Sequence, residues 1–323
     1  MEFGEKDLFH NGNRMREWDP MEFLSVEISV KTLCPFHSNL REIMVWIEAI
    51  DTLYTRPYLN TRSNEMEEST ETVAEFIVRS RRIVVFTGAG ASTESGIADF
   101  RSRGGIWDKY NPEDFYFQKF LTSEESREKY WQMSTELYES LRKAKANPVH
   151  LAIAELEKLD KLDCVITQNI DGLHHKAGNS REKVIELHGT ALSVSCLSCR
   201  RKYDRDEVQE WIRKGVRVPR CDGCEGLLKP DTISFGQAMP ERETNLAYER
   251  SSGSDLFIVV GSSLVVQPAA YMPLRAKQAG AKLVIINRDS TPHDGYADVV
   301  INGVAGEIMA RILEKVGGKM GSS

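Results

Sequence analysis

Short apolar runs, each bounded by turn residues, recur along the chain from residue 83 onward. Runs of this length are typical of β-strands that are buried on both faces. The predicted strands are Ile83–Phe86, Cys164–Thr167, Val184–Leu187, Leu256–Val260, Leu283–Ile286 and Val299–Ile301. Apolar residues at helical spacing predict helices around Val73–Ile77 and over Val149–Leu159, Ala269–Ala279 and Glu307–Val316. This alternation predicts an α/β fold with a parallel sheet that carries helices on both faces.

Three stretches depart from the alternation. Residues 101–148 are polar, aromatic and helical in character, and residues 190–230 carry two cysteine pairs, so both are interpreted as insertions that together form a small lobe. Residues 1–65 show no repeat and only one helical stretch, Leu40–Leu53. We therefore expect a catalytic domain over residues 66–318 and an N-terminal extension outside the fold. Either Met66 is the true translation start, or the extension has a regulatory or targeting role.

Composition and charge narrow the class of protein. The 323 residues carry a formal net charge of −6, which argues against direct nucleic-acid binding, because Lys and Arg contacts to phosphate supply most of that affinity. No apolar run approaches the ~20 residues of a membrane helix. The first residues have neither the basic start nor the apolar core of a secretory signal. We expect a cytoplasmic protein without a membrane partner.

Four of the six cysteines form two pairs, Cys196/Cys199 and Cys221/Cys224. In a reducing compartment this spacing favours metal over disulfides, and four thiolates are typical of tetrahedral zinc. Because such a set leaves no open position for water or substrate, we expect one structural Zn²⁺ per chain. The unpaired Cys164 lies in an apolar run and is expected to be a small buried side chain.

A glycine-containing turn, Thr87-Gly88-Ala89-Gly90-Ala91-Ser92, follows the first predicted strand directly. Glycines there allow a sharp turn and a close approach to a pyrophosphate, which the N-terminus of a following helix would favour. Thr93 stands where hydride-transfer enzymes carry a third glycine or alanine, and no acidic strand end follows at the usual distance. A nucleotide site without ordinary dehydrogenase chemistry is indicated, although a plain tight turn would have the same residues.

An ordered series of motifs over about Glu67 to Val316 resembles the sirtuins, the silent-information-regulator family of NAD-dependent deacylases. The motifs are Gly88-Ala89-Gly90-Ala91-Ser92, Gly96-Ile97-x-Asp99-Phe100-Arg101, Thr167-Gln168-Asn169-Ile170-Asp171, His188-Gly189, the four cysteines, Phe235-Gly236 and Gly261-Ser262-Ser263-Leu264. The resemblance implies a Rossmann-like domain with NAD as co-substrate and acyl-lysine proteins or peptides as partners. The implied products are nicotinamide, O-acetyl-ADP-ribose and the free lysine.

The resemblance also implies roles for individual residues. His188 would be the general base that deprotonates a ribose hydroxyl, which suits an imidazole at neutral pH; without the other motifs it would be read as a residue that ends a strand. Asn169 and Asp171 would complete the catalytic set at the nicotinamide and ribose. The other implied NAD contacts are Gly88, Ala89, Gly90, Ser92, Asp99, Phe100, Arg101, Gln168, Gly261, Ser262, Ser263 and Asn287.

Two departures from the family pattern, and one comparison with the family members that remove acidic acyl groups, bear on detail. Ala98 stands where proline is usual, so the loop that carries Asp99 is expected to be less rigid. Gln237 replaces a common glutamate, which keeps the shape and loses the charge. The sirtuins that remove acidic acyl groups carry a Tyr-x-x-Arg pair, but here no arginine follows Tyr130 by three residues. We therefore expect neutral acyl groups to be preferred over succinyl or malonyl groups, whose carboxylate would be buried unpaired.

Two other functions remain open on the sequence. The same electrophilic ribose could be captured by another nucleophile, which would make the chain a protein ADP-ribosyltransferase. A non-catalytic NAD sensor or zinc-ribbon binding protein is the third possibility, and it has less need of a base such as His188.

Overall fold

The computed structural model describes residues 56–321, with side chains from residue 63 onward. The predicted extension, including its helical stretch Leu40–Leu53, lies almost entirely outside the described residues. The described helix α4, Arg56–Arg79, runs through Met66 without a break. No helix in the described part of the chain has the length and apolar character that crossing a membrane requires.

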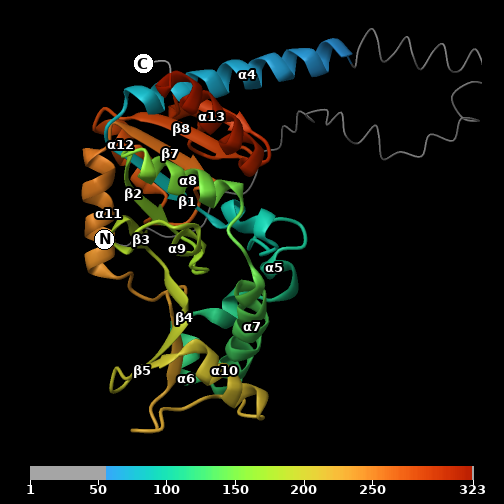
Figure 1. Ribbon diagram of the computed structural model, residues 1–323. Helices are drawn as coiled ribbons and strands as arrows, with labels where there is room; N and C mark the ends of the chain where they lie inside the picture. The colour runs from blue at the N-terminus through green and yellow to red at the C-terminus, as the bar shows by residue number, and fades with distance from the viewer. Residues whose placement is uncertain (1–55, 322–323) are drawn as a thin grey trace, which may run out of the picture. The chain divides into compact units, whose positions relative to one another are not determined.

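The centre of the fold is a six-stranded parallel sheet with strand order β3-β2-β1-β7-β8-β9 (Figure 1). Its strands are β1 (Ile83–Thr87), β2 (Leu162–Thr167), β3 (Val184–Glu186), β7 (Leu256–Val260), β8 (Lys282–Asn287) and β9 (Val299–Asn302). All six strands predicted from the apolar runs belong to this sheet. The chain builds the sheet outward from β1 in one direction and then from β7 in the other, so the topological switch point lies between β1 and β7. Ligands of open α/β sheets bind at the carboxyl ends of the strands at such a point.

Successive strand residues face opposite sides, and each side has its own hydrophobic core. Ile83 and Val85 of β1 pack with α4, α8 (Pro148–Lys158) and α13 (Ala305–Met320). Val84 and Phe86 pack with α11 (Glu241–Gly253) and α12 (Tyr271–Gln278) on the other face. Cys164 is buried among the latter group, as expected. The prediction of a parallel sheet covered on both faces is confirmed.

The small lobe contains both predicted insertions. The helical part holds α5 (Ile106–Lys109), η3 (Pro112–Phe115), α6 (Phe117–Thr122) and α7 (Glu124–Lys143). The cysteine part is an antiparallel sheet of order β5-β4-β6 with one helix, made of β4 (Gly189–Cys196), β5 (Lys202–Asp204), β6 (Leu228–Thr232) and α10 (Arg205–Arg213). Trp131 of α7 is packed among Val194, Tyr203 and Val208 of the cysteine part, so the two insertions share one hydrophobic core.

Short elements at the strand ends complete the fold and shape the cavity. They are η2 (Ala89–Ser95), α9 (Leu173–Ala177), η4 (Arg181–Lys183) and η5 (Asp294–Tyr296). The segment after Gly88 is therefore a 3₁₀ helix and not the α-helix that a dinucleotide fingerprint would place there. The residue that caps its C-terminus is Gly96, which adopts φ +80°.

Candidate active site and metal centre

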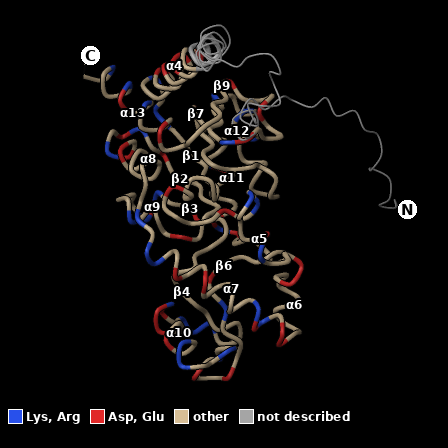
Figure 2. The backbone as a smooth tube through the Cα atoms, turned by 90° about the vertical axis from the view of Figure 1, so that its right-hand side faces the viewer, with Lys and Arg blue, Asp and Glu red and all other residues tan. Residues whose placement is uncertain are grey.

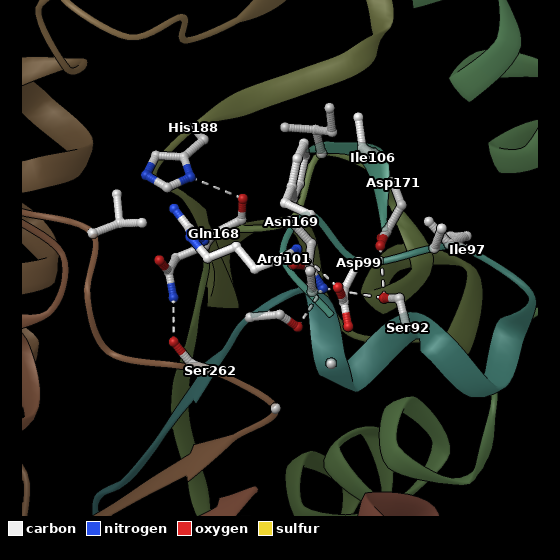
Figure 3. Close-up of a pocket in the computed structure, with 18 of the residues that line it drawn as sticks. Ser92, Ile97, Asp99, Arg101, Ile106, Gln168, Asn169, Asp171, His188 and Ser262 are labelled. Carbon is white, nitrogen blue, oxygen red and sulfur yellow. Dashed lines mark hydrogen bonds between the residues drawn. The ribbon is translucent and has the colours of Figure 1, made fainter. Parts of the chain in front are cut away.

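One cavity of about 380 Å³ lies between the carboxyl ends of the large sheet and the small lobe. Its size is within the ordinary range of small-molecule sites. Every residue that the sequence assigned to NAD binding or catalysis lines this cavity, in agreement with the switch-point rule: Gly88, Ala89, Gly90, Ser92, Asp99, Phe100, Arg101, Gln168, Asn169, Asp171, His188, Gly261, Ser262, Ser263 and Asn287. Figure 3 shows many of them, and the β-strands and loops from which they point inward.

The glycine turn after β1 packs directly against the end of β7. The amide of Gly90 donates to the carbonyl oxygen of Gly261 at 2.9 Å. A Cβ atom at Gly88 would lie 2.6 Å from the same oxygen, and Gly261 adopts φ +63°. Only residues without a side chain fit at both places, and their absence of Cβ atoms leaves a backbone-lined surface suited to a pyrophosphate.

A buried polar network lies beside this turn. Asp171 is 4% exposed and accepts a hydrogen bond from Ser92 Oγ at 2.7 Å, while its other oxygen accepts the Leu173 amide at 2.8 Å. Asn169 Nδ2 donates to the Gly88 carbonyl at 3.0 Å and to Ser92 Oγ at 3.1 Å. These bonds fix both side chains with little freedom at the cavity wall, an arrangement that preorganises a binding site.

His188 follows β3, and a backbone carbonyl group holds its side chain. Its Nδ1 lies 3.0 Å from the carbonyl oxygen of Gln168 (Figure 3). A carbonyl only accepts, so Nδ1 carries the proton and Nε2 keeps a free lone pair. Burial lowers the pKa of His188 below its ordinary value, and the bond to Gln168 opposes this shift. The neutral imidazole that results at neutral pH is the form a general base requires.

Among the other predicted NAD contacts, some side chains are held by hydrogen bonds and one is exposed to the cavity. Gln168 Nε2 donates to Ser262 Oγ at 2.8 Å, which joins the ends of β2 and β7. Ser263 is exposed to the cavity, and Asn287 Nδ2 donates to the carbonyl of Asp289 at 2.8 Å.

Asp99 caps its own loop, since one oxygen accepts the amides of Arg101 and Ser102 at 3.0 and 2.8 Å and the other accepts the Ser102 hydroxyl at 2.6 Å. A contact from Asp99 to NAD stays a prediction.

The sequence reasoning missed two groups of residues around the cavity. The ring of Phe100 lies 5.4 Å from that of Trp107, which in turn contacts Phe115 at 5.9 Å and Phe235 at 6.0 Å between centroids. The aromatic richness of residues 101–148 was the available signal for this cluster.

The second missed group is a pair of buried histidines behind the network. His150 Nε2 lies 3.4 Å from Ser92 Oγ, and His174 Nε2 lies 3.0 Å from Thr87 Oγ1. Burial lowers the pKa of His150 to about 4 and holds the pKa of His174 well below its usual range. Both rings are therefore neutral hydrogen-bonding groups at physiological pH. His150 lies in the predicted helix Val149–Leu159, whose pattern gave no sign of a polar contact, and His174 lies in α9, which the sequence did not predict.

The four paired cysteines meet in the small lobe. Their Sγ atoms all lie within 4.8 Å of one another, with 3.5 Å between Cys196 and Cys224 and 3.6 Å between Cys199 and Cys221. Sulfurs of a tetrahedral site with Zn–S bonds of ~2.3 Å are about 3.8 Å apart, so the four side chains fit Zn²⁺. The Tyr203 hydroxyl lies 3.1 Å from Cys221 Sγ and also contacts the carboxylate of Asp222, so it packs against that ligand from outside the cluster. Such a site would hold β4 and the loop before β6 together.

Replacing Cys199 by serine is expected to remove most of the bound zinc and to destabilise the small lobe, because structural zinc contributes folding free energy directly. The measurements are metal content and thermal unfolding of the purified variant. Cys164→Ala is the matched control: it removes a buried thiol outside the set and should keep one zinc per chain. Zinc-free protein that remains folded and active would contradict the structural role.

The fold and the site together define a nucleotide-binding α/β protein with a structural metal module. The Sir2 family model matches residues 88–268. NAD-dependent protein deacylase 2 of Archaeoglobus fulgidus is 44% identical over 252 residues, which are 78% of this chain and 97% of that protein. NAD-dependent protein deacetylase of Sulfolobus acidocaldarius is 45% identical over 237 residues, 72% of this chain and 90% of that protein.

The solved structures that resemble this chain are also Sir2 proteins. A Sir2 enzyme structure described for its mechanism and regulation has a TM-score of 0.72 at 43% identity and covers 78% of this chain and 99% of its own. A Sir2 variant with a deacetylated p53 peptide and 3′-O-acetyl-ADP-ribose has a TM-score of 0.72 at 38% identity, covering 76% and 97%. The chain belongs to the Sir2 family.

Proposed function

We propose that this chain is an NAD-dependent protein lysine deacylase that transfers the acyl group of a modified lysine to ADP-ribose and releases nicotinamide. The observation that carries the proposal is the geometry of His188, whose Nδ1 is tied to Gln168 and whose Nε2 is free at the cavity. The names of the relatives, NAD-dependent protein deacylases and deacetylases, support the same activity.

The proposed roles follow from the contacts of each side chain. His188 removes a proton from a ribose hydroxyl, and Asn169 and Asp171 form the polar wall beside the nicotinamide. The glycine turn and the residues after β7 and β8 hold the phosphates and the adenosine. Phe100, within its aromatic cluster, excludes water from the reacting carbon. NAD supplies the electrophilic ribose carbon when it is bound.

The test is mass spectrometry of an acetyl-lysine peptide incubated with the protein, with and without NAD. Deacylation removes the acetyl mass only when NAD is present and yields O-acetyl-ADP-ribose. Addition of ADP-ribose to a protein would indicate the transferase instead. If neither the peptide nor the protein changes in mass, the chain is the non-catalytic binding protein. His188 favours the first outcome because neither alternative requires a base at that position.

Acyl-lysine proteins or peptides are the proposed partners, and the cytoplasm is the proposed compartment. Solved Sir2 structures with p53 and propionylated peptides support a peptide substrate. The formal net charge of −6 supports the absence of nucleic acid among the proposed partners. Figure 2 shows Lys and Arg interspersed with Asp and Glu along the described part of the chain.

A chain that begins at Met66 is expected to fold and to keep its deacylase activity, because the proposed catalytic domain starts there. Met66 packs against the core, and Glu71 forms an ion pair with Lys315 of α13 at 3.1 Å, so the retained part of α4 is anchored. Activity and thermal unfolding of the truncated and full chains are to be compared. Folded but inactive truncated protein would show that the preceding residues take part in function.

The acid limb of kcat/KM is expected below pH 6.5. His188 must be neutral to act, and burial lowers its pKa, so activity falls only when the pH drops through that lowered value. Burial, and to a lesser degree Asp171, raises the pKa of nearby Glu186 to about 7. Glu186→Gln is therefore the control: the acid limb should persist in this variant. A limb at or above pH 7 that disappears with Glu186 would assign it to the carboxyl group.

A further inference from the structure

The small-lobe end of the cavity is lined by Tyr130, Met133 and Ser134 of α7 and by Thr232 of β6, a set of residues that we call the acyl wall. The glycine turn, Gln168 and Asn287 belong to the large-sheet end, where the proposed function places NAD. Since the cavity is continuous, the acyl wall is left to contact the acyl group of the substrate. The inference below rests on that function.

A buried cation lies behind Ser134. Arg205 is fully buried, with its guanidinium carbon 4.6 Å from the centroid of the Tyr138 ring and 5.2 Å from that of Trp131. Its Nη2 donates to Ser134 Oγ and to the Ser134 backbone carbonyl, both at 3.4 Å, whereas Nε and Nη1 have no hydrogen-bond partner among the described residues. Burial lowers the pKa of Arg205 to about 10, so the group remains charged at neutral pH. Within the described residues it forms no ion pair with a carboxylate.

A second buried cation lies behind Tyr130. Lys229 is 2% exposed, and its Nζ lies 5.4 Å from the centroid of the Tyr130 ring. It donates to the carbonyl oxygens of Thr232 and Pro230, at 2.5 and 3.4 Å. In the part of the chain that the structure describes, Lys229 also lacks a carboxylate in ion-pair contact. Two buried positive charges thus lie behind the same wall, and no carboxylate of the described residues is in direct contact to neutralise them.

The existing hydrogen bonds of the acyl wall determine which of its hydroxyl groups can donate a hydrogen bond to a ligand. Ser134 Oγ accepts from a guanidinium, so its own proton points away from Arg205 and is free to be donated. Tyr130 and Thr232 share one hydrogen bond of 2.8 Å, so one of their two protons is likewise left over. A hydroxyl that accepts from a cation becomes a stronger donor. The acyl wall therefore presents hydrogen-bond donors in a positive field, next to the apolar Met133.

We propose that the acyl wall selects acyl groups that carry an oxygen acceptor along their chain, and that hydroxyacyl-lysine is the substrate class it favours. A hydroxyl oxygen can accept from Ser134 or from the Tyr130–Thr232 pair and remain neutral. The carboxylate of an acidic acyl group loses far more hydration on burial than a hydroxyl does, and it meets no cation directly to offset this cost, because Arg205 and Lys229 are both covered. The expected preference for neutral acyl groups therefore extends to a preference for polar neutral ones.

The test compares two peptides of one sequence, modified with 3-hydroxybutyryl-lysine or butyryl-lysine, which differ by a single hydroxyl. We expect kcat/KM of the full chain with NAD to favour the hydroxylated peptide by about threefold to tenfold, the range of one net hydrogen bond. Ser134→Ala and Tyr130→Phe should each bring this ratio toward one. Because both substrates are measured on each variant, a general loss of activity does not affect the ratio.

Thr135→Ala is the matched control, since it removes a hydroxyl from the next position of α7, which does not line this cavity, and it should keep the wild-type ratio. Arg205→Met should lower the ratio as Ser134→Ala does; if this variant fails to fold, the other two decide. A wild-type ratio of one or less, or a ratio unchanged in both Ser134→Ala and Tyr130→Phe, overturns the inference while acetyl-lysine turnover still supports the proposed function. No turnover of any acyl peptide would overturn both.

Discussion

Replacement of His188 by alanine is expected to nearly abolish O-acetyl-ADP-ribose formation while NAD binding and much of the nicotinamide exchange remain. Attack of the acyl oxygen on the ribose is driven by positioning and by the leaving group, so it needs no base. The next step requires a ribose hydroxyl to become a nucleophile, and a positioned base contributes ~10²–10⁴-fold to such a step. Exchange of isotopically labelled nicotinamide reports the first step alone, and product formation reports both.

His293→Ala is the matched control for this experiment. His293 is also half-buried, and its Nε2 lies 3.0 Å from the backbone carbonyl of Ala270, but it does not line the cavity. It should retain both reactions. Parallel loss of exchange and product formation in His188→Ala, in folded protein that binds NAD, would mean that His188 also assists the first step. Full deacylation by that variant would assign the base to another residue.

The sequence predicted the large sheet well because buried parallel strands have a strong local signal. In β7, every residue from Leu256 to Val260 is buried, and its predicted bounds are those of the structure. Strand β3 is less distinct: it was expected to extend to Leu187, but it ends at Glu186. Helix α11 was not predicted, because its exposed sequence Glu241–Gly253 has only Ala247 and Ser251 buried and so lacks an apolar periodicity.

The candidate site was predictable where motifs sit at strand ends and unpredictable where packing brings distant segments together. The glycine turn and Gln168–Asp171 follow strands directly, so their meeting at one edge follows from topology alone. The contact between Arg205 and Ser134 joins two insertions that are 71 positions apart, and no local pattern indicates it. The zinc ligands form an intermediate case, since their spacing specifies the cluster but not its packing against Trp131.

Replacement of Gly261 by alanine is expected to lower NAD affinity by about 10²-fold, the cost of a misplacement near 1 Å in a preorganised site. A Cβ atom there would lie 2.2 Å from the Ala91 backbone nitrogen and 2.5 Å from the Gly90 carbonyl carbon, and neither can yield without moving the glycine turn. The φ of +63° adds strain for any residue with a side chain. NAD titration by calorimetry, beside thermal unfolding, measures both effects.

Gly280→Ala separates the clash from the strain. Gly280 has φ +100°, and a Cβ atom there would meet nothing within 4 Å, so its substitution costs only the ~1–2 kcal/mol of a left-handed residue. Its NAD affinity should equal that of the parent chain, although its unfolding temperature falls. If Gly261→Ala binds NAD as tightly as Gly280→Ala does, the contact between the turn after β1 and the end of β7 does not shape the nucleotide site. A loss of affinity confined to Gly261→Ala ties NAD binding to the close packing of these two strand ends at the switch point.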